Sequence, residues 1–396
     1  MIKKKYLEII YVCLLYLFVL QYFLQEYIQI FQYFDEFIAI LFFPVFIVYV
    51  IKKHGKIKVD KKDIIIVLCL LGVIIIGLFS NFLYGYQETK YIVSDIIVFL
   101  KFFLVYFLAK IIFTNGLREF NRKISTNIKI ITFILFILSI LNYIFKFLPF
   151  ATERFGISSN QLFFGHPTVL AAITAMLMLN LLVFGYKLNK SFYITIAMQM
   201  VLIISTLRTK AIAYVIVAII LMIYVLKLRK KIKILNIALL IVLCCIIGYK
   251  QIVFYFTQDN TARASLLNTS FEIANDYFPF GTGFATYGSY FSGVNYSPIY
   301  EMYGIDNVFG LSQEDPSFMS DSFWPMLLGQ FGYIGTILYL ICILLIFINI
   351  QEKYSLENKN IYLAKILALV YLLISSTSES AFVNPIAIPF AIILAL

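Results

Sequence analysis

Long apolar runs separated by short polar segments repeat along almost the whole chain. A bilayer core about 30 Å thick needs roughly 20 apolar residues per helix, and helices satisfy their own backbone hydrogen bonds there. We therefore predict an all-α polytopic integral membrane protein, a single membrane domain over residues 1–396 with about twelve spans. The predicted spans are residues 6–24, 37–51, 64–83, 91–113, 129–148, 167–185, 192–206, 209–226, 234–249, 326–350, 361–378 and 381–396.

Lysine and arginine are distributed unevenly between alternate segments. If the N-terminus is cytoplasmic, the cytoplasmic segments carry 22 of the 32 basic residues and the outer segments carry seven. Because basic loops tend to stay in the cytoplasm, both termini are predicted to be cytoplasmic. The segment at residues 250–325, between spans nine and ten, then becomes one large extracytoplasmic loop.

This predicted loop has a composition unlike the rest of the chain. It holds eight acidic residues, two basic residues and eighteen aromatic residues. Long loops are usually functional or disordered, and one so rich in aromatic residues is not expected to be disordered. We expect irregular backbone with short helices, folded onto the membrane domain.

The overall composition excludes several classes of protein. The chain is 62% hydrophobic and 13% charged, with a mean hydropathy of +0.92, whereas soluble domains carry about 25% charged residues. The net charge of +11 does not indicate nucleic-acid binding, because the basic residues form short clusters between apolar runs. All five cysteines fall inside apolar runs, so neither a metal site nor a disulfide framework is expected. No cofactor motif is present.

Charged residues of the outer segments are the candidates for chemistry. Arg154 and His166 flank one short outer loop, Arg208 and Lys210 occupy the turn between spans seven and eight, and Arg263 lies in the large loop. We expect these segments to bring basic groups to the same level of the membrane. Arginine suits bidentate contact with phosphate oxygens, so a lipid-linked phosphate or pyrophosphate is the expected ligand.

Some of these residues also have purely structural interpretations, which the sequence leaves open. Arg208 and Lys210 could cap a tight, solvated helical turn. Arg263 could form an ion pair within the loop, with Asp259 or Glu272 as its partner.

Further polar residues are equally ambiguous. His166 precedes Pro167 and could simply start a helix, and Asp321 could cap the following span. Lys101, in the fourth span, could pair with a neighbouring helix or line a polar cavity. Gly281 and Gly283 lack the remaining residues of a nucleotide-binding motif and are expected to form a tight turn. The aromatic residues around them could form the core of the loop or a platform for sugar rings.

The order of these motifs resembles that of the bacterial O-antigen polymerase (Wzy-type) and O-antigen ligase superfamily. The resemblance covers essentially the whole chain and depends mainly on the large loop. The segments that carry it are 154–156 with 165–167, Thr206-Leu207-Arg208-Thr209-Lys210, Arg263, Phe280-Gly281-Thr282-Gly283-Phe284, Tyr296-Ser297-Pro298-Ile299-Tyr300, Asp321-Ser322-Phe323-Trp324 and 329–335.

The resemblance implies a metal-independent glycosyltransferase without a cofactor, at the outer face of the bacterial cytoplasmic membrane. Such a polymerase joins oligosaccharide repeat units carried on undecaprenyl pyrophosphate, and a chain-length regulator and a flippase are the implied protein partners. The implied site consists of Arg263 and Asp321 as catalytic residues. Substrate contacts are expected from Arg208, Lys210, Arg154, His166, Tyr296 and Tyr300.

Two other functions remain as alternatives. The ligase branch of the superfamily carries a histidine near the end of the large loop, where this chain has Asp321, which favours the polymerase. A flippase or another transporter would commonly show two related halves with a site at the membrane midplane, whereas here the charge concentrates in an outer loop of one half.

Overall fold

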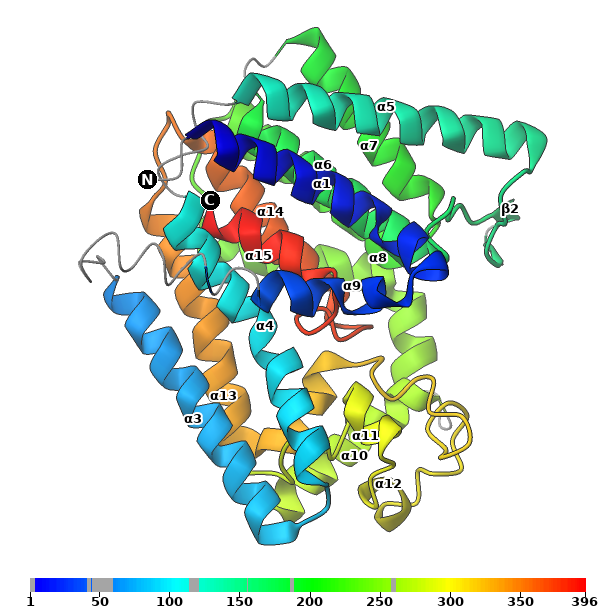
Figure 1. Ribbon diagram of the computed structural model, residues 1–396, viewed down its shortest axis with the longest axis vertical. Helices are drawn as coiled ribbons and strands as arrows, with labels where there is room; N and C mark the ends of the chain where they lie inside the picture. Colours follow the sequence, from blue (N-terminus) through cyan, green and yellow to red (C-terminus); the bar gives the residue numbers. More distant parts are fainter. Residues whose placement is uncertain are drawn as a thin grey trace.

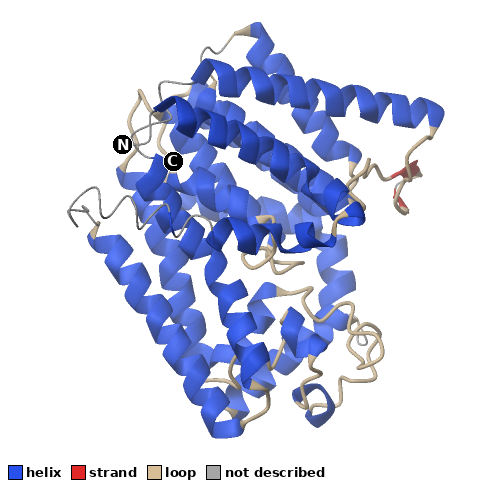
Figure 2. Cartoon of the chain, in the orientation of Figure 1, coloured by secondary structure: helices blue, strands red, loops and turns tan. Residues whose placement is uncertain are grey.

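The computed structural model describes residues 4–40, 44, 60–113, 121–154, 156–185, 189–257 and 261–396, and these residues are mostly helical (Figures 1 and 2). Among them, seven helical segments are long and apolar enough to cross a membrane. This confirms an all-α polytopic membrane protein, while the number of spans stays a prediction. The seven are α1 (Lys4–Tyr27), α3 (Lys61–Tyr84), α4 (Thr89–Phe113), α5 (Asn121–Phe145), α6 (Pro167–Phe184), α8 (Thr209–Met222) with its π-helical end η3 (Ile223–Lys227), and α13 (Phe323–Glu352).

The other predicted spans differ more from the structure. Helices α7 (Lys190–Ser205), α9 (Ile234–Thr257) and α14 (Lys359–Ser375) lie where spans were expected. Helix α15 (Ala387–Ala395) has nine residues and rises only about 14 Å, less than half of the bilayer core. It therefore does not cross the membrane by itself, as the span predicted at 381–396 would. Most of the span predicted at 37–51 lies outside the described residues.

Capping residues set where several helices begin. Asp60 accepts a hydrogen bond from the Lys62 amide at the start of α3, and Thr261 accepts one from Ala264 at the start of α10 (Ala262–Asp276). His166 does the same for α6 through its ring, and Pro167 occupies the first helical position. The caps of α3 and α6 lie next to long apolar runs, which is why the starts of these two helices could be predicted, whereas the start of α10 was not predicted.

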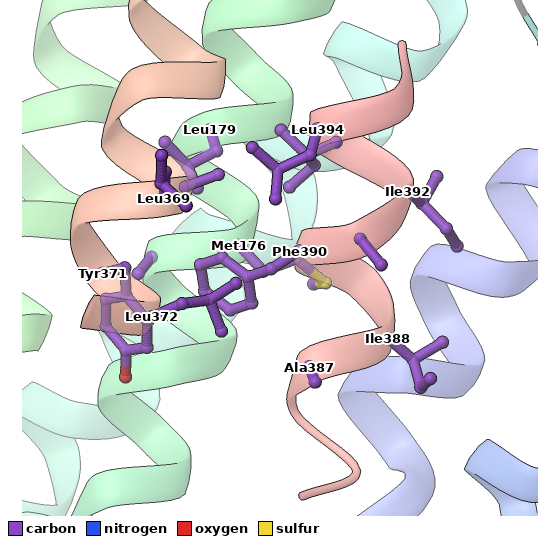
Figure 3. Packing of buried hydrophobic residues seen from close by; sticks show 14 of the residues in the cluster. Met176, Leu179, Leu369, Tyr371, Leu372, Ala387, Ile388, Phe390, Ile392 and Leu394 are labelled. Atoms are coloured by element: carbon purple, nitrogen blue, oxygen red, sulfur yellow. The ribbon is translucent and has the colours of Figure 1, made fainter. Parts of the chain in front are cut away.

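The helices form two groups that cross in Figure 1. Helices α1, α5, α6 and α7 run across the upper part of the view, and α3, α4 and α13 descend in its lower part. The short helix α15 packs against α4, α6 and α14. Figure 3 shows this contact: the ring of Tyr371 on α14 stacks on Phe390 of α15, with their centroids 4.6 Å apart. The C-terminal helix is therefore part of the core.

The segment predicted as the large loop is largely ordered. Helix α9 continues to Thr257, so the first part of the predicted loop is helical, and three further helices follow: α10, α11 (Tyr290–Val294) and α12 (Ile299–Met302). Helix α10 packs against α13. The segment also has a small core of its own, formed by eight buried residues that include Leu266, Tyr287 and Leu311.

Residues 281–288, which we call the glycine turn, are fastened to the membrane helices. Asn81 of α3 donates to and accepts from the backbone of Phe284, at 3.0 and 2.8 Å. Asp95 of α4 accepts from the Ala285 amide at 2.7 Å, and Gln330 of α13 donates to the Tyr287 carbonyl at 2.9 Å. The two glycines thus form a tight turn, as expected, and three helices hold it.

Lys101 and the two strands complete the fold. Lys101 is buried and pairs with Asp35 and, at 3.0 Å, with Glu36. Of its two interpretations, the structure shows the pairing with a neighbouring segment. The strands β1 (Glu153–Arg154) and β2 (Ile157–Ser158) form a small antiparallel hairpin before α6.

Candidate functional site

A cavity of about 1110 Å³ lies between α8, α9, α10, α13 and α14. Its charged lining residues are located before α6, at the starts of α8 and α10, just before α13 and after the end of α14. All six charged or ionisable residues that the sequence singled out for this site are among them. Among the described residues, the charged or ionisable side chains that line it are Arg154, His166, Arg208, Lys210, Arg263, Asp321 and Glu379, which we call the charged end of the cavity.

The chain brings these residues together by joining two turns that are distant in sequence. The Ser159 hydroxyl donates to the Thr206 carbonyl at 2.6 Å, and the Asn160 amide donates to the Ser205 carbonyl at 3.0 Å. These bonds fasten the segment before α6 to the turn between α7 and α8. Within that turn Leu207 has a φ of 51°, a left-handed conformation that is uncommon for a residue with a side chain. Arg208 follows directly and lies beside His166.

Two ion pairs complete the charged end. Lys210 Nζ lies 3.0 Å from Glu379 Oε1, and Arg263 Nη2 lies 2.8 Å from Asp321 Oδ2. Arg263 also donates to the Ser378 carbonyl at 3.3 Å. The lining therefore carries more cations than carboxylates, and the carboxylates hold two of the cations in place.

These contacts decide between several of the structural interpretations. Lys210 is only 19% exposed and faces the cavity, so it does not belong to a merely solvated turn. The carboxylate that pairs with Arg263 is Asp321 rather than Glu272, and Asp259 lies outside the described residues. The cap position of α13 is occupied by Ser322 instead of Asp321.

His166 serves the fold and the cavity with different ring nitrogens. Nδ1 accepts the Thr168 amide at 3.2 Å, and Nε2 lies 3.3 Å from Arg208 Nη2. Burial and the nearby charges of Arg208 and Lys210 lower the pKa of His166 to about 4, so the ring is neutral at pH 7. With Nδ1 accepting, the single proton is on Nε2. Two N–H donors therefore converge, which is the arrangement that an anionic oxygen between them would satisfy.

Two hydroxyl groups at the cavity were not anticipated from the sequence. Ser322 Oγ and Thr209 Oγ1 are buried and make no hydrogen bond to any described residue. Both residues line the cavity. Buried polar groups normally have partners, so these two hydroxyls are unsatisfied polar groups beside the cavity.

Away from the charged end, the lining is apolar and comes from single faces of three helices. On α8, Ala213, Val217 and Leu221 follow Thr209 at intervals of four residues, which places them in one row about 18 Å long. Helix α14 contributes a similar row, and α9 contributes the opposite side. These rows contain Ile366, Leu369, Val370 and Leu373 on α14, and Ile237, Leu240, Cys244 and Gly248 on α9. We call this part of the cavity the apolar trench.

Tyr296 and Tyr300, which were expected to contact substrate, lie elsewhere. Tyr300 is fully buried; its hydroxyl accepts from the Gly288 amide at 2.8 Å and lies 2.8 Å from Ser292 Oγ. Tyr296 donates to the Leu311 carbonyl at 2.9 Å. Neither lines the cavity, because both serve the core of the loop. The aromatic side chains that do line it are Phe309, Phe318, Trp324 and Phe347.

Glu379 was missed by the sequence reasoning, although a signal was present. It is the single acidic residue between residues 361 and 396, and it lies in the short segment between the last two predicted spans. A carboxylate at the boundary of two apolar runs indicates a candidate site residue, as a basic residue at such a boundary does.

One family model matches a segment of the chain that includes several residues of the charged end. The family model for O-antigen ligase matches residues 192–340, from α7 to the middle of α13. Over this segment the chain is similar to the O-antigen polymerase and ligase superfamily. The matched segment contains Arg208, Lys210, Arg263 and Asp321, whereas Arg154, His166 and Glu379 lie outside it. No curated protein matches the chain.

The similarity of this segment to the O-antigen ligase family supports polymerase or ligase function in general and does not distinguish the two. Among the described residues, no cluster of three or more His, Cys, Asp or Glu side chains could hold a metal ion.

Proposed function

We propose that the protein is a polysaccharide polymerase, which joins oligosaccharide repeat units carried on a lipid diphosphate such as undecaprenyl pyrophosphate. The observation that carries this proposal is the continuity of the charged end and the apolar trench in one cavity. A polyprenyl diphosphate has a matching structure, with a strongly anionic group next to a long hydrocarbon chain. By the distribution of basic residues, the charged end would face the outer side of the bacterial cytoplasmic membrane.

The cations would bind the diphosphate of the donor. Arg208 and Arg263 suit bidentate contact with phosphate oxygens, and Lys210 and Arg154 add positive charge. His166 would donate a hydrogen bond from Nε2–H to the same phosphate oxygen that Arg208 contacts. The two converging N–H groups would then share one anionic acceptor. Fixed cations in a partly dry cavity stabilise the negative charge that develops on a departing diphosphate.

The reaction itself would need little covalent participation by the protein. A hydroxyl oxygen of the acceptor sugar attacks the anomeric carbon of the donor, and the bond from this carbon to the phosphate oxygen breaks. The electron pair of that bond remains on the lipid diphosphate, and the hydroxyl proton passes to a carboxylate. Asp321 and Glu379 are the carboxylates at the cavity.

Substrate binding would weaken the ion pairs of these two carboxylates and so make them better proton acceptors. Asp321 is paired with Arg263, and Glu379 is paired with Lys210. A diphosphate that recruits these cations weakens both pairs, and a carboxylate that loses its cation becomes more basic. Burial already raises the pKa of Asp321, despite the opposing effect of Arg263. Binding of the donor would thus favour proton transfer from the acceptor.

The choice of polymerase over ligase depends on the end of the large loop. Asp321 occupies the position at which the ligase branch is expected to carry a histidine, and its pairing with Arg263 makes it part of the charged end. A polymerase also requires two lipid-linked reactants in the same membrane plane, and holding them together supplies much of the rate enhancement.

The proposal is tested with purified protein in liposomes and repeat units on their lipid carrier, extracted from cells of the source that lack this protein. The wild-type protein should give a ladder of polymers. Arg208→Ala and Arg263→Ala should each reduce the rate at least about 100-fold, because each removes one charge-stabilising group. Arg122→Ala is the matched control; this residue is exposed at the start of α5, away from the cavity.

The products distinguish the alternatives. Transfer of glycan to a different lipid acceptor, without a ladder, would identify a ligase, and movement of intact repeat units across the bilayer would identify a transporter. Asp321→Asn and Glu379→Gln assign the carboxylates. Loss of the proton acceptor lowers kcat with little change in KM, whereas loss of a residue that positions a cation raises KM. Full activity of both arginine variants would refute the proposal.

A further inference from the structure

Two phenylalanine side chains stand exposed at the charged cavity. Phe309 and Phe318 both line it, and their rings meet edge to face with centroids 5.6 Å apart. Phe309 is 76% exposed and Phe318 is 36% exposed. Large apolar side chains that remain accessible beside charged groups often mark a binding surface, and neither ring takes part in the reaction proposed above.

The chain holds the inner ring of this pair rigidly. The Phe318 amide donates to the Gly310 carbonyl at 2.9 Å, which closes residues 310–318 into a compact loop. Gly310 has a φ of 82°, and a Cβ atom at this position would collide with the Phe318 ring. The ring thus lies directly on the glycine backbone, in space that is available only because no side chain is present.

The same segment links the pair to the charged end. The Asp321 amide donates to the Phe318 carbonyl at 3.1 Å, so the turn that carries the ring also carries the carboxylate. Met319, between them, is buried in the core of the loop. A group that packs on Phe318 is therefore held at a fixed position relative to Asp321 and Arg263.

We infer that Phe309 and Phe318 form a subsite for a sugar ring of the glycan, adjacent to the charged end of the cavity. The identity of the ligand rests on the proposed function, while the existence of the subsite rests on the geometry of the two rings. One face of many sugar rings is a surface of C–H groups, which packs on the face of an aromatic ring. The faces of the two rings point in different directions, so the subsite would favour sugars of a particular shape.

The composition of the pair argues against the role of a membrane anchor. Residues that anchor proteins at the lipid–water interface are typically Trp and Tyr, whereas this pair is purely hydrocarbon. Other exposed aromatic residues of the same segment, such as Phe278 at 70% and Tyr290 at 68%, do not line the cavity. The location at the cavity, and not exposure alone, distinguishes Phe309 and Phe318.

The test compares the binding of two probes to the full-length protein in nanodiscs. The first is the repeat-unit oligosaccharide, released by mild acid from the lipid carrier of the source cells. The second is undecaprenyl diphosphate without sugar. Phe309→Ala and Phe318→Ala should each weaken oligosaccharide binding about tenfold and leave binding of the sugar-free carrier unchanged. Phe309→Trp should retain oligosaccharide binding because it preserves an aromatic face.

Phe278→Ala is the matched control, since it removes an equally exposed ring outside the cavity. Oligosaccharide binding by Phe309→Ala and Phe318→Ala equal to that of the control would overturn the inference. Equal weakening of both probes would also overturn it, since the rings would then contact the carrier lipid. If Arg208→Ala binds the sugar-free carrier normally while Phe309→Ala loses the oligosaccharide, the proposed function fails and the sugar subsite stands.

Discussion

At the scale of single residues, His166 shows how one side chain can be both structural and functional. Its Nδ1 caps α6 and its Nε2 faces Arg208 at the cavity. The two interpretations that the sequence left open are therefore compatible, because the capping bond fixes which nitrogen carries the proton.

Binding of a diphosphate should change the protonation of His166. Burial and the cations beside it lower its pKa to about 4, and an anion placed between His166 and Arg208 offsets that repulsion. We expect the pKa to rise toward the ordinary value of about 6.5, so that affinity for the anion increases as the pH falls below the raised pKa. NMR titration of the ring, with and without undecaprenyl diphosphate, measures the shift directly.

The chain contains two histidines, His54 and His166, so a His54→Gln background gives a single signal. Arg208→Ala in that background should raise the pKa of the ligand-free ring, because it removes one of the cations that lower it. A pKa that stays near 4 in saturating ligand would show that no anion binds beside the ring.

The cations of the site and Asp321 could be predicted from the sequence, whereas its aromatic members and Glu379 were not. Charges are rare at the boundary of apolar runs, so each one is informative. Aromatic residues make up 18% of the chain, and nothing in their spacing separates Tyr300, in the core of the loop, from Phe309 at the cavity. That distinction depends on the path of the backbone between residues 281 and 320.

At the scale of elements, α13 is interrupted at Gly332, where φ is 59° and ψ is −163°. The break packs on residues 279–281, and a Cβ atom at Gly332 would collide with the Pro279 carbonyl and lie 2.8 Å from the Gly281 amide. The apolar pattern predicted a continuous span at 326–350. Periodicity could not reveal the break, because the contact that requires it comes from a segment 50 residues earlier in the chain.

Substitution of Gly332 by alanine should destabilise the protein strongly. At this φ and ψ, which only glycine adopts readily, an alanine is strained by roughly 1–3 kcal/mol, and the collision with residues 279–281 adds to this cost. Gly304→Ala is the matched control, since Gly304 has a φ of 64° and open space around it. Thermal unfolding in detergent should show a much larger drop in Tm for Gly332→Ala. Equal drops would mean that the backbone conformation alone matters.

At the scale of the whole molecule, the loop and the membrane helices form one structure. Asn81, Asp95 and Gln330 each hold a different part of the glycine turn, and α10 packs along α13. The sequence predicted that the loop would fold onto the membrane domain because of its aromatic content. It could not identify Asp95 as an attachment point, because a carboxylate inside an apolar run is equally compatible with other roles.

Removal of the Asp95 carboxylate should release the loop. In Asp95→Ala the buried Ala285 amide loses its acceptor, which costs about 1–3 kcal/mol. We expect faster cleavage by added protease within residues 281–310, together with loss of activity. Asp276→Ala is the control, since Asp276 accepts a hydrogen bond from Tyr303 at the exposed side of the same segment. Cleavage no faster than in the control would show that the other bonds suffice.

The attachment of the glycine turn to three helices also limits how this scaffold can be re-engineered. A loop transplanted alone from a related protein would lack its attachment points, since these belong to α3, α4 and α13. A chimera that carries the loop of a related protein should therefore be functional only when the residues at positions 81, 95 and 330 are also taken from that protein.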